Sequence, residues 1–128
     1  MKFHHVCIFG SDYKKSMDFY VNKLGLQVFR ESYSRKKDAK KIELYCNGEY
    51  IIELFVKEDL AEQDGCRKCS FRPGLEHLSF LTENVQKKLQ MLKGQGVSVT
   101  EVREDAATGK PYGFCYDPDG TKIEFYEE

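Results

Sequence analysis

The chain has 128 residues, a formal net charge of −1, 41% hydrophobic and 32% charged residues, which are ordinary values for one compact globular unit. It lacks the basic excess of a general nucleic-acid or membrane-surface binder, so neither kind of partner is expected. No apolar run approaches the roughly 20 residues needed to cross a bilayer, and the N-terminus has no signal-peptide core or cleavage site, so a cytoplasmic protein is expected.

The first half of the chain predicts a strand, a helix and three further strands. An apolar strand over 5–9 is followed by a helix that Ser11 or Asp12 caps and Gly25 ends. The segments after it alternate as strands do, with Asn47-Gly48 as a hairpin turn between the last two: 27–34, 40–46 and 50–57.

The second half predicts the same order of elements. A strand over 76–82 leads into a helix that begins at Thr82 or Asn84 and ends by Gly94 or Gly96. Strands are expected near 97–103, 112–117 and 121–127, with the Asp-Pro-Asp-Gly turn at 117–120 before the last.

The two halves are copies of one unit. A shift of 72 residues places His5 on His77, and a shift of 71 places Glu53, within Ile-Glu-Leu-Phe, on Glu124, within Ile-Glu-Phe-Tyr. The sequence therefore predicts an α+β fold of two tandem βαβββ modules in one compact domain. Their expected bounds are 1–57 and 74–128, with a polar linker at 58–73.

The repeat selects four side chains whose chemistry suits a common site. Each half opens with a histidine and closes, 48 or 47 residues later, with a glutamate in an apolar strand. Two neutral imidazoles and two carboxylates around a divalent cation sum to zero charge and leave positions for water or substrate. We therefore expect His5, Glu53, His77 and Glu124 to be metal ligands. The repeat register selects His5, and strand alternation predicts that His4 points to the other face.

The chain resembles the glyoxalase I-like branch of the vicinal oxygen chelate superfamily over essentially its whole length. The resemblance rests on His-His-Val-Cys-Ile at 4–8, the helix at 11–20, Leu-Gly-Leu at 24–26, Ile-Ile-Glu-Leu-Phe at 51–55, Glu-His-Leu-Ser-Phe at 76–80, Thr-Gly-Lys at 108–110 and Asp-Pro-Asp-Gly-Thr-Lys-Ile-Glu at 117–124.

The resemblance implies a lactoylglutathione lyase-like carbon–sulfur lyase. Such an enzyme converts the hemithioacetal of a 2-oxoaldehyde and a thiol into a 2-hydroxyacyl thioester. By analogy Glu124 is the catalytic base and Glu53 the alternative or second base. One divalent ion per site is implied, with nickel or cobalt favoured over zinc and zinc kept as an alternative, and a homodimer is favoured.

Other functions stay open at this point. The chain is alternatively another metalloenzyme of the superfamily (an epimerase, dioxygenase or thiol transferase), or a metal-free protein that binds or sequesters a small molecule. The residues identify neither the thiol nor the metal. They also do not decide whether a site forms within one chain or across a dimer.

Two further patterns have simpler readings. The five cysteines favour free thiols over a disulfide framework, and Cys66-x-x-Cys69 is read as two loop thiols rather than a redox or zinc element. The basic segment 30–41 is read as an exposed hairpin rather than a site that steers an anionic substrate. The stretch 108–112 is a candidate substrate-facing turn, with Lys110 or Arg103 as candidate contacts for a carboxylate.

Overall fold

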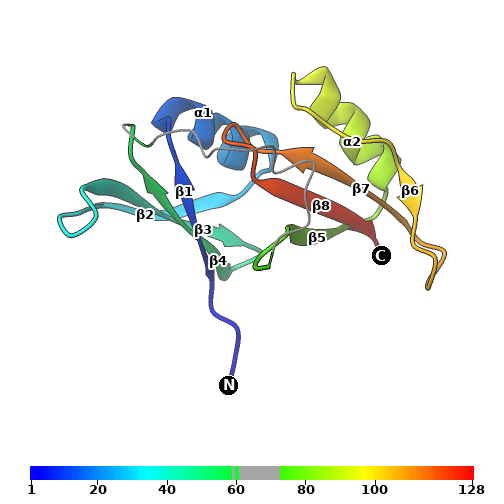
Figure 1. Ribbon diagram of the computed structural model, residues 1–128, viewed down its shortest axis with the longest axis horizontal. Coiled ribbons are helices and arrows are strands. Elements are labelled where there is room, and N and C mark those ends of the chain that lie inside the picture. Colours follow the sequence, from blue (N-terminus) through cyan, green and yellow to red (C-terminus); the bar gives the residue numbers. More distant parts are fainter. Residues whose placement is uncertain (59, 61–72) are drawn as a thin grey trace. The chain divides into compact units, whose positions relative to one another are not determined.

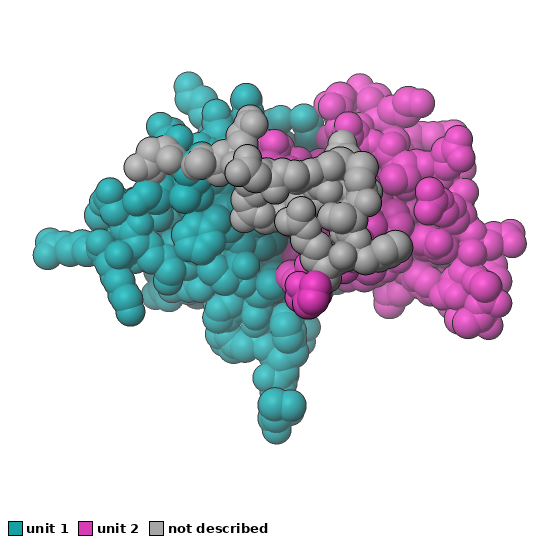
Figure 2. All heavy atoms as spheres, viewed as in Figure 1, with its two compact units in different colours: residues 1–63 teal, residues 64–128 magenta. Residues whose placement is uncertain are grey.

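The computed structural model describes residues 1–58, 60 and 73–128. The chain divides into two compact units, Met1–Gln63 and Asp64–Glu128, coloured separately in Figure 2. Each unit holds one four-stranded sheet, and each is taken by itself below. Within the described residues, no helix is both long and apolar enough to span a membrane.

Unit 1 is a sheet whose first and last strands lie side by side. The strand order is β1-β4-β3-β2; β1 and β4 run parallel, and the other neighbours are antiparallel (Figure 1). The elements are β1 (Val6–Gly10), α1 (Tyr13–Met17), η1 (Asp18–Lys23), β2 (Gln27–Ser34), β3 (Ala39–Cys46) and β4 (Glu49–Val56).

The helical segment of unit 1 begins and ends as its sequence predicts. The Asp12 side chain accepts a hydrogen bond from the backbone N–H of Lys15, which caps α1. The helix continues as the π-helical turn η1 and stops at Gly25, whose φ of +81° favours a residue without a Cβ atom.

The two faces of this sheet differ in character. Ile42, Leu44, Ile52 and Leu54 are all at most 1% exposed and form the core face. Because side chains alternate along a strand, Glu43 and Glu53 lie on the opposite face, together with Cys7. The candidate ligands of unit 1 therefore belong to the polar face.

Unit 2 repeats this arrangement. The strand order is β5-β8-β7-β6, again with the first and last strands parallel. The elements are β5 (Leu78–Thr82), α2 (Val85–Gly94), β6 (Arg103–Glu104), β7 (Pro111–Tyr116) and β8 (Lys122–Glu127).

Helix α2 packs closely on the core face of the second sheet. The Asn84 side chain caps it by accepting from the backbone N–H of Lys87. A Cβ atom added to Gly113 of β7 would lie 2.5 Å from Cδ1 of Leu89, a helix side chain that is 3% exposed. Glycine therefore allows α2 to approach β7, and the other face of the sheet is left for Phe114 and Glu124.

The predicted α+β fold of two βαβββ modules is confirmed, with two local differences. The strand expected over 97–103 is reduced to Arg103–Glu104 and an isolated bridge between Val99 and Cys115. The strands expected to include His5 and His77 begin one residue later, at Val6 and Leu78. Most of the expected linker 58–73 lies outside the described residues, so its bounds stay a prediction.

Candidate functional site

In unit 1, parallel strands bring the first predicted pair together. His5 directly precedes β1, and Glu53 lies in the middle of β4, opposite Cys7. The Nε2 atom of His5 lies 3.4 Å from Oε2 of Glu53. The side chains are 30% and 17% exposed, so the pair is accessible at its edge.

Unit 2 contains an equivalent pair. His77 directly precedes β5, and Glu124 of β8 lies opposite Ser79. The Nε2 atom of His77 lies 3.3 Å from Oε2 of Glu124, and the side chains are 31% and 14% exposed. Distance, atoms and exposure all match those of the first pair, so the repeat is preserved at the level of the donor atoms.

The donor separation suits a shared cation. A charge-assisted hydrogen bond between nitrogen and a carboxylate is about 2.7–2.9 Å long, shorter than the 3.4 and 3.3 Å found here. Two ligands bound about 2.0–2.2 Å from one ion lie about 3.0–3.4 Å apart. The donors fit a divalent metal as two half-sites. Among the described residues, they do not form a group of three or more that could hold an ion. A single four-ligand site therefore stays a prediction.

The surroundings of His77 fix the orientation of its imidazole ring. Its Nδ1 atom is hydrogen-bonded to a carboxylate oxygen of Glu76. An ionised carboxylate only accepts hydrogen bonds, so the proton in this contact lies on Nδ1 of His77, and Nε2 is the ring nitrogen that faces Glu124. With Nε2 unprotonated, two acceptors would face each other, and a shared cation would satisfy both. Histidines that bind metals typically donate their other ring N–H to a carboxylate or carbonyl, and the Glu76 contact of His77 is of this kind.

A lysine completes the Glu76 contact. Lys122 Nζ donates to Glu76 Oε1 over 2.6 Å and lies 4.1 Å above the centre of the Phe114 ring. The hydrogen bonds from Lys122 and then His77 lower the pKa of Glu76. Glu76 is therefore ionised at neutral pH and acts as an acceptor for both groups.

The surroundings of His5 are different. A bulge in β4 puts Tyr50 opposite Tyr45, and the Tyr50 ring stacks on the His5 imidazole with centroids 4.7 Å apart. The Nδ1 atom of His4 lies 2.7 Å from Nδ1 of His5. The expectation that strand alternation turns His4 to the opposite face does not hold, because both histidines precede β1 and their rings lie side by side.

The phenol oxygen of Tyr50 lacks a hydrogen-bond partner among the described residues, although it is buried. Burial, followed by the negative charge of Glu53, raises the pKa of Tyr50 to about 12. The hydroxyl thus stays protonated at neutral pH and keeps a free donor beside the first half-site.

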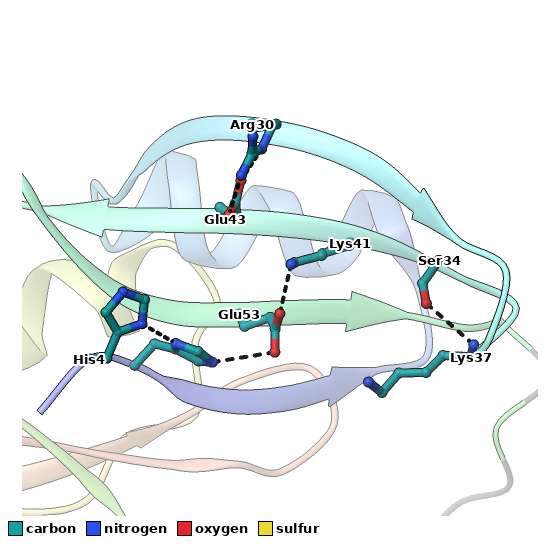
Figure 3. A network of polar contacts seen from close by, with 8 residues as sticks. His4, Arg30, Ser34, Lys37, Lys41, Glu43 and Glu53 are labelled. Carbon is teal, nitrogen blue, oxygen red and sulfur yellow. Dashed lines mark hydrogen bonds and ion pairs between the residues drawn. The ribbon is translucent and has the colours of Figure 1, made fainter.

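Glu53 has a second neighbour that its sequence environment did not reveal. Lys41 Nζ lies 2.9 Å from Glu53 Oε1, so the carboxylate bridges Lys41 and His5 (Figure 3). Burial alone raises the pKa of Glu53, but the hydrogen bond and charge of Lys41 outweigh it and hold the pKa below its usual value. One oxygen of Glu53 is thus engaged by a cation of the protein and the other faces His5.

The neighbouring Glu43 is neutralised separately. Its side chain is 9% exposed, and Arg30 binds it through Nε and Nη2 (Figure 3). The hydrogen bond from Arg30 lowers the pKa of Glu43 against the effect of burial. Arg30 is therefore committed to Glu43, which agrees with the reading of the basic segment as a charged hairpin.

The remaining expectations concern cysteines and one turn. Cys7, Cys46 and Cys115 are free thiols, as expected, and Cys66 and Cys69 lie outside the described residues. Thr108, from the candidate substrate-facing turn, is hydrogen-bonded to the Tyr126 hydroxyl, which also donates to Asp105 over 3.0 Å. This turn is tied to β8 two residues beyond Glu124. For Lys110 and Arg103, a substrate contact stays a prediction.

Comparison with known proteins agrees with the fold and the repeat. Residues 2–125 match the family model of the Glyoxalase/Bleomycin resistance protein/Dioxygenase superfamily. The uncharacterized protein YwkD of Bacillus subtilis (strain 168) is 40% identical over 98% of this chain and 95% of its own. The uncharacterized protein YaeR of Escherichia coli (strain K12) is 33% identical over 98% and 95%.

Solved structures show the same relationship. A glyoxalase family protein from Enterococcus faecalis has a TM-score of 0.85 and 32% identity, over 98% of this chain and 97% of that one. Because the family model covers nearly the whole sequence and relatives exceed 30% identity over almost their full length, the chain belongs to the Glyoxalase/Bleomycin resistance protein/Dioxygenase superfamily.

Proposed function

We propose that this protein is a metal-dependent glyoxalase I-like lyase that isomerises the hemithioacetal of a 2-oxoaldehyde and a thiol. The observation that carries the proposal is the matched pair of half-sites, with Nε2–Oε2 distances of 3.4 and 3.3 Å. A trypanothione-dependent glyoxalase I of Leishmania major has the same fold, with a TM-score of 0.76 at 21% identity, covering 100% of this chain and 87% of that one. That likeness supports the fold alone. The proposed chemistry rests on the donor atoms of the two histidine–glutamate pairs.

The four donors would together hold one divalent ion, within one chain or between two copies. His5 and His77 supply neutral nitrogen, and Glu53 and Glu124 supply carboxylate oxygen. This mixed set suits nickel, cobalt or zinc better than the oxygen-only sets that calcium and magnesium prefer. A bound metal supplies Lewis-acid stabilisation of the two neighbouring substrate oxygens.

The carboxylates of the chain would carry out the proton transfer. The substrate carbon that carries sulfur and hydroxyl loses its proton to a carboxylate, and the same carboxylate returns the proton to the adjacent carbon. Glu124 is the proposed base, because no lysine or arginine within the described residues forms an ion pair with it. Glu53 is the second candidate, and Lys41 occupies one of its oxygens. No net oxidation occurs in this isomerisation.

Metal content and turnover test the proposal in order. Protein purified without chelators should contain about one divalent ion per site, measured by mass spectrometry of the metal. Formation of thioester from methylglyoxal should then be assayed with several low-molecular-weight thiols and with added nickel, cobalt or zinc.

Single-residue variants test the role proposed for each residue. Glu124→Gln should lower kcat by at least about 100-fold, the usual contribution of a general base, and His77→Ala should abolish stoichiometric metal binding. Glu49→Gln is the matched control, because Glu49 is an exposed residue of β4. Metal binding without turnover on any thiol would indicate another reaction of the superfamily. Protein that binds no divalent ion would indicate a metal-free binding protein.

A further inference from the structure

The two glutamates of the repeat have unlike surroundings. Glu53 is paired with Lys41 over 2.9 Å, whereas Glu124 has no lysine or arginine partner among the described residues. The repeat shift of 71 places Tyr112 at the position of Lys41. The lysine is thus a feature of one half only, added to an otherwise symmetrical arrangement of donors.

The strand β3 aims this lysine at the carboxylate. Glu43 lies opposite Glu53 in the β3–β4 ladder, so Lys41, two residues away on the same face, is a diagonal neighbour of Glu53. Lys40 is adjacent in sequence but points to the other face, where its Nζ lies 4.1 Å from the centre of the Tyr13 ring. Figure 3 shows Lys41 and Glu53 reaching toward each other from neighbouring strands.

We propose that Lys41 is a positioning residue that makes Glu53 a fixed, one-oxygen ligand and so leaves Glu124 as the mobile base. The inference rests on the proposed function. Lys41 holds Oε1, and only Oε2 remains directed toward His5. A carboxylate tied in this way cannot rotate freely to collect a proton, whereas no lysine or arginine among the described residues restrains Glu124 in this way.

The lysine also changes the charge balance at the metal. Two carboxylates would cancel a divalent ion, but Lys41 adds one positive charge, so the loaded site has a net charge of +1. A site with this excess holds its metal less tightly and stabilises the anion formed when the substrate loses its proton. Lys41 therefore lowers the affinity for the metal and raises the rate of turnover.

Matched lysine variants test both effects. Metal affinity would be measured with nickel alone, by competition with a chromophoric chelator, and kcat and KM with the active thiol. Lys41→Met should bind nickel roughly tenfold more tightly and lower kcat by at least about tenfold, with a smaller change in KM. Lys41→Arg should restore both quantities toward the wild-type values. Lys40→Met removes the same charge one residue away and should change neither.

The opposite directions of the two effects separate positioning from support of the fold. Weaker nickel binding in Lys41→Met, or equal behaviour of Lys41→Met and Lys40→Met, overturns the role of Lys41 while the proposed function stands. If wild-type protein binds nickel but turns over no thiol adduct, tighter binding by Lys41→Met still supports the inference. If wild-type protein binds no divalent ion, both proposals fall.

Discussion

Replacing Tyr50 by phenylalanine removes one hydroxyl group whose surroundings are unusual. The Tyr50 oxygen is buried without a hydrogen-bond partner in the part of the chain that the structure describes, and an unsatisfied buried polar group costs about 1–3 kcal/mol. The ring that stacks on His5 is unchanged by the substitution. Tyr50→Phe should therefore increase the free energy of unfolding by about 1–2 kcal/mol, which for a domain of this length raises Tm by roughly 3–8 °C.

Thermal and urea unfolding of metal-free protein, followed by circular dichroism, measure this effect. Tyr45→Phe is the control, because the Tyr45 ring stacks on Tyr50 at 5.3 Å and Tyr45 is only half-buried. Its stability should change by less than about 0.5 kcal/mol. A decrease in stability for Tyr50→Phe would show that the hydroxyl has a hydrogen-bond partner in solution, and the reasoning would be refuted.

Three further predictions concern metal affinity, acid stability and packing. Glu76→Gln removes the carboxylate that orients His77 and should weaken nickel binding about 10–100-fold in a chelator competition. Glu43→Gln should lower Tm at pH 7. The hydrogen bond from Arg30 lowers the folded-state pKa of Glu43 below the unfolded value of about 4.3, so this stabilisation is present above that pH and is lost as the pH falls through the folded pKa. The Tm difference between the two proteins should therefore narrow as the pH is lowered through that range. Gly113→Ala places a Cβ atom 2.5 Å from Leu89 and should cost about 1–3 kcal/mol in urea unfolding.

Controls accompany these three variants. Glu83→Gln changes an exposed glutamate just before α2 and should leave nickel affinity unchanged. Gly94→Ala adds a methyl group where no atom lies within 4 Å, in the last turn of α2, so it should not destabilise the protein. A Tm difference for Glu43→Gln that does not narrow as the pH is lowered into the acid range would argue against the ion pair. Gly113→Ala with wild-type stability would show that Leu89 moves aside without cost.

Much of the fold was readable from the sequence because its signals are local. Asp12 and Asn84 cap helices, Gly25 ends one, and the Asn47-Gly48 turn joins β3 to β4, as predicted. The sequence predicts a longer strand at this position than the two-residue β6 of the structure. The sequence of 97–103 alternates as a strand does, but only Arg103 pairs in a ladder, and whether an apolar segment forms a full strand depends on its neighbours rather than on its own pattern.

The sequence predicted which residues form the candidate site, but it did not predict which side chains surround them. The repeat register selected His5, Glu53, His77 and Glu124, and each unit brings its own histidine and glutamate together. The contact between Lys41 and Glu53 was not predicted, because the two residues are diagonal neighbours on adjacent strands. The β3–β4 hairpin register, worked outward from Asn47-Gly48, is the signal that points to it.

Each histidine–glutamate pair joins the first strand of its module to the last. The strands β1 and β4 are neighbours in space although the whole module lies between them in sequence, and the same holds for β5 and β8. Such parallel contacts between distant segments form late, because closing a long loop costs entropy before the pairing repays it. A nascent chain that has not yet added its closing strand thus lacks the donor pair of that module, and the metal binding that we propose would wait for each module to be completed.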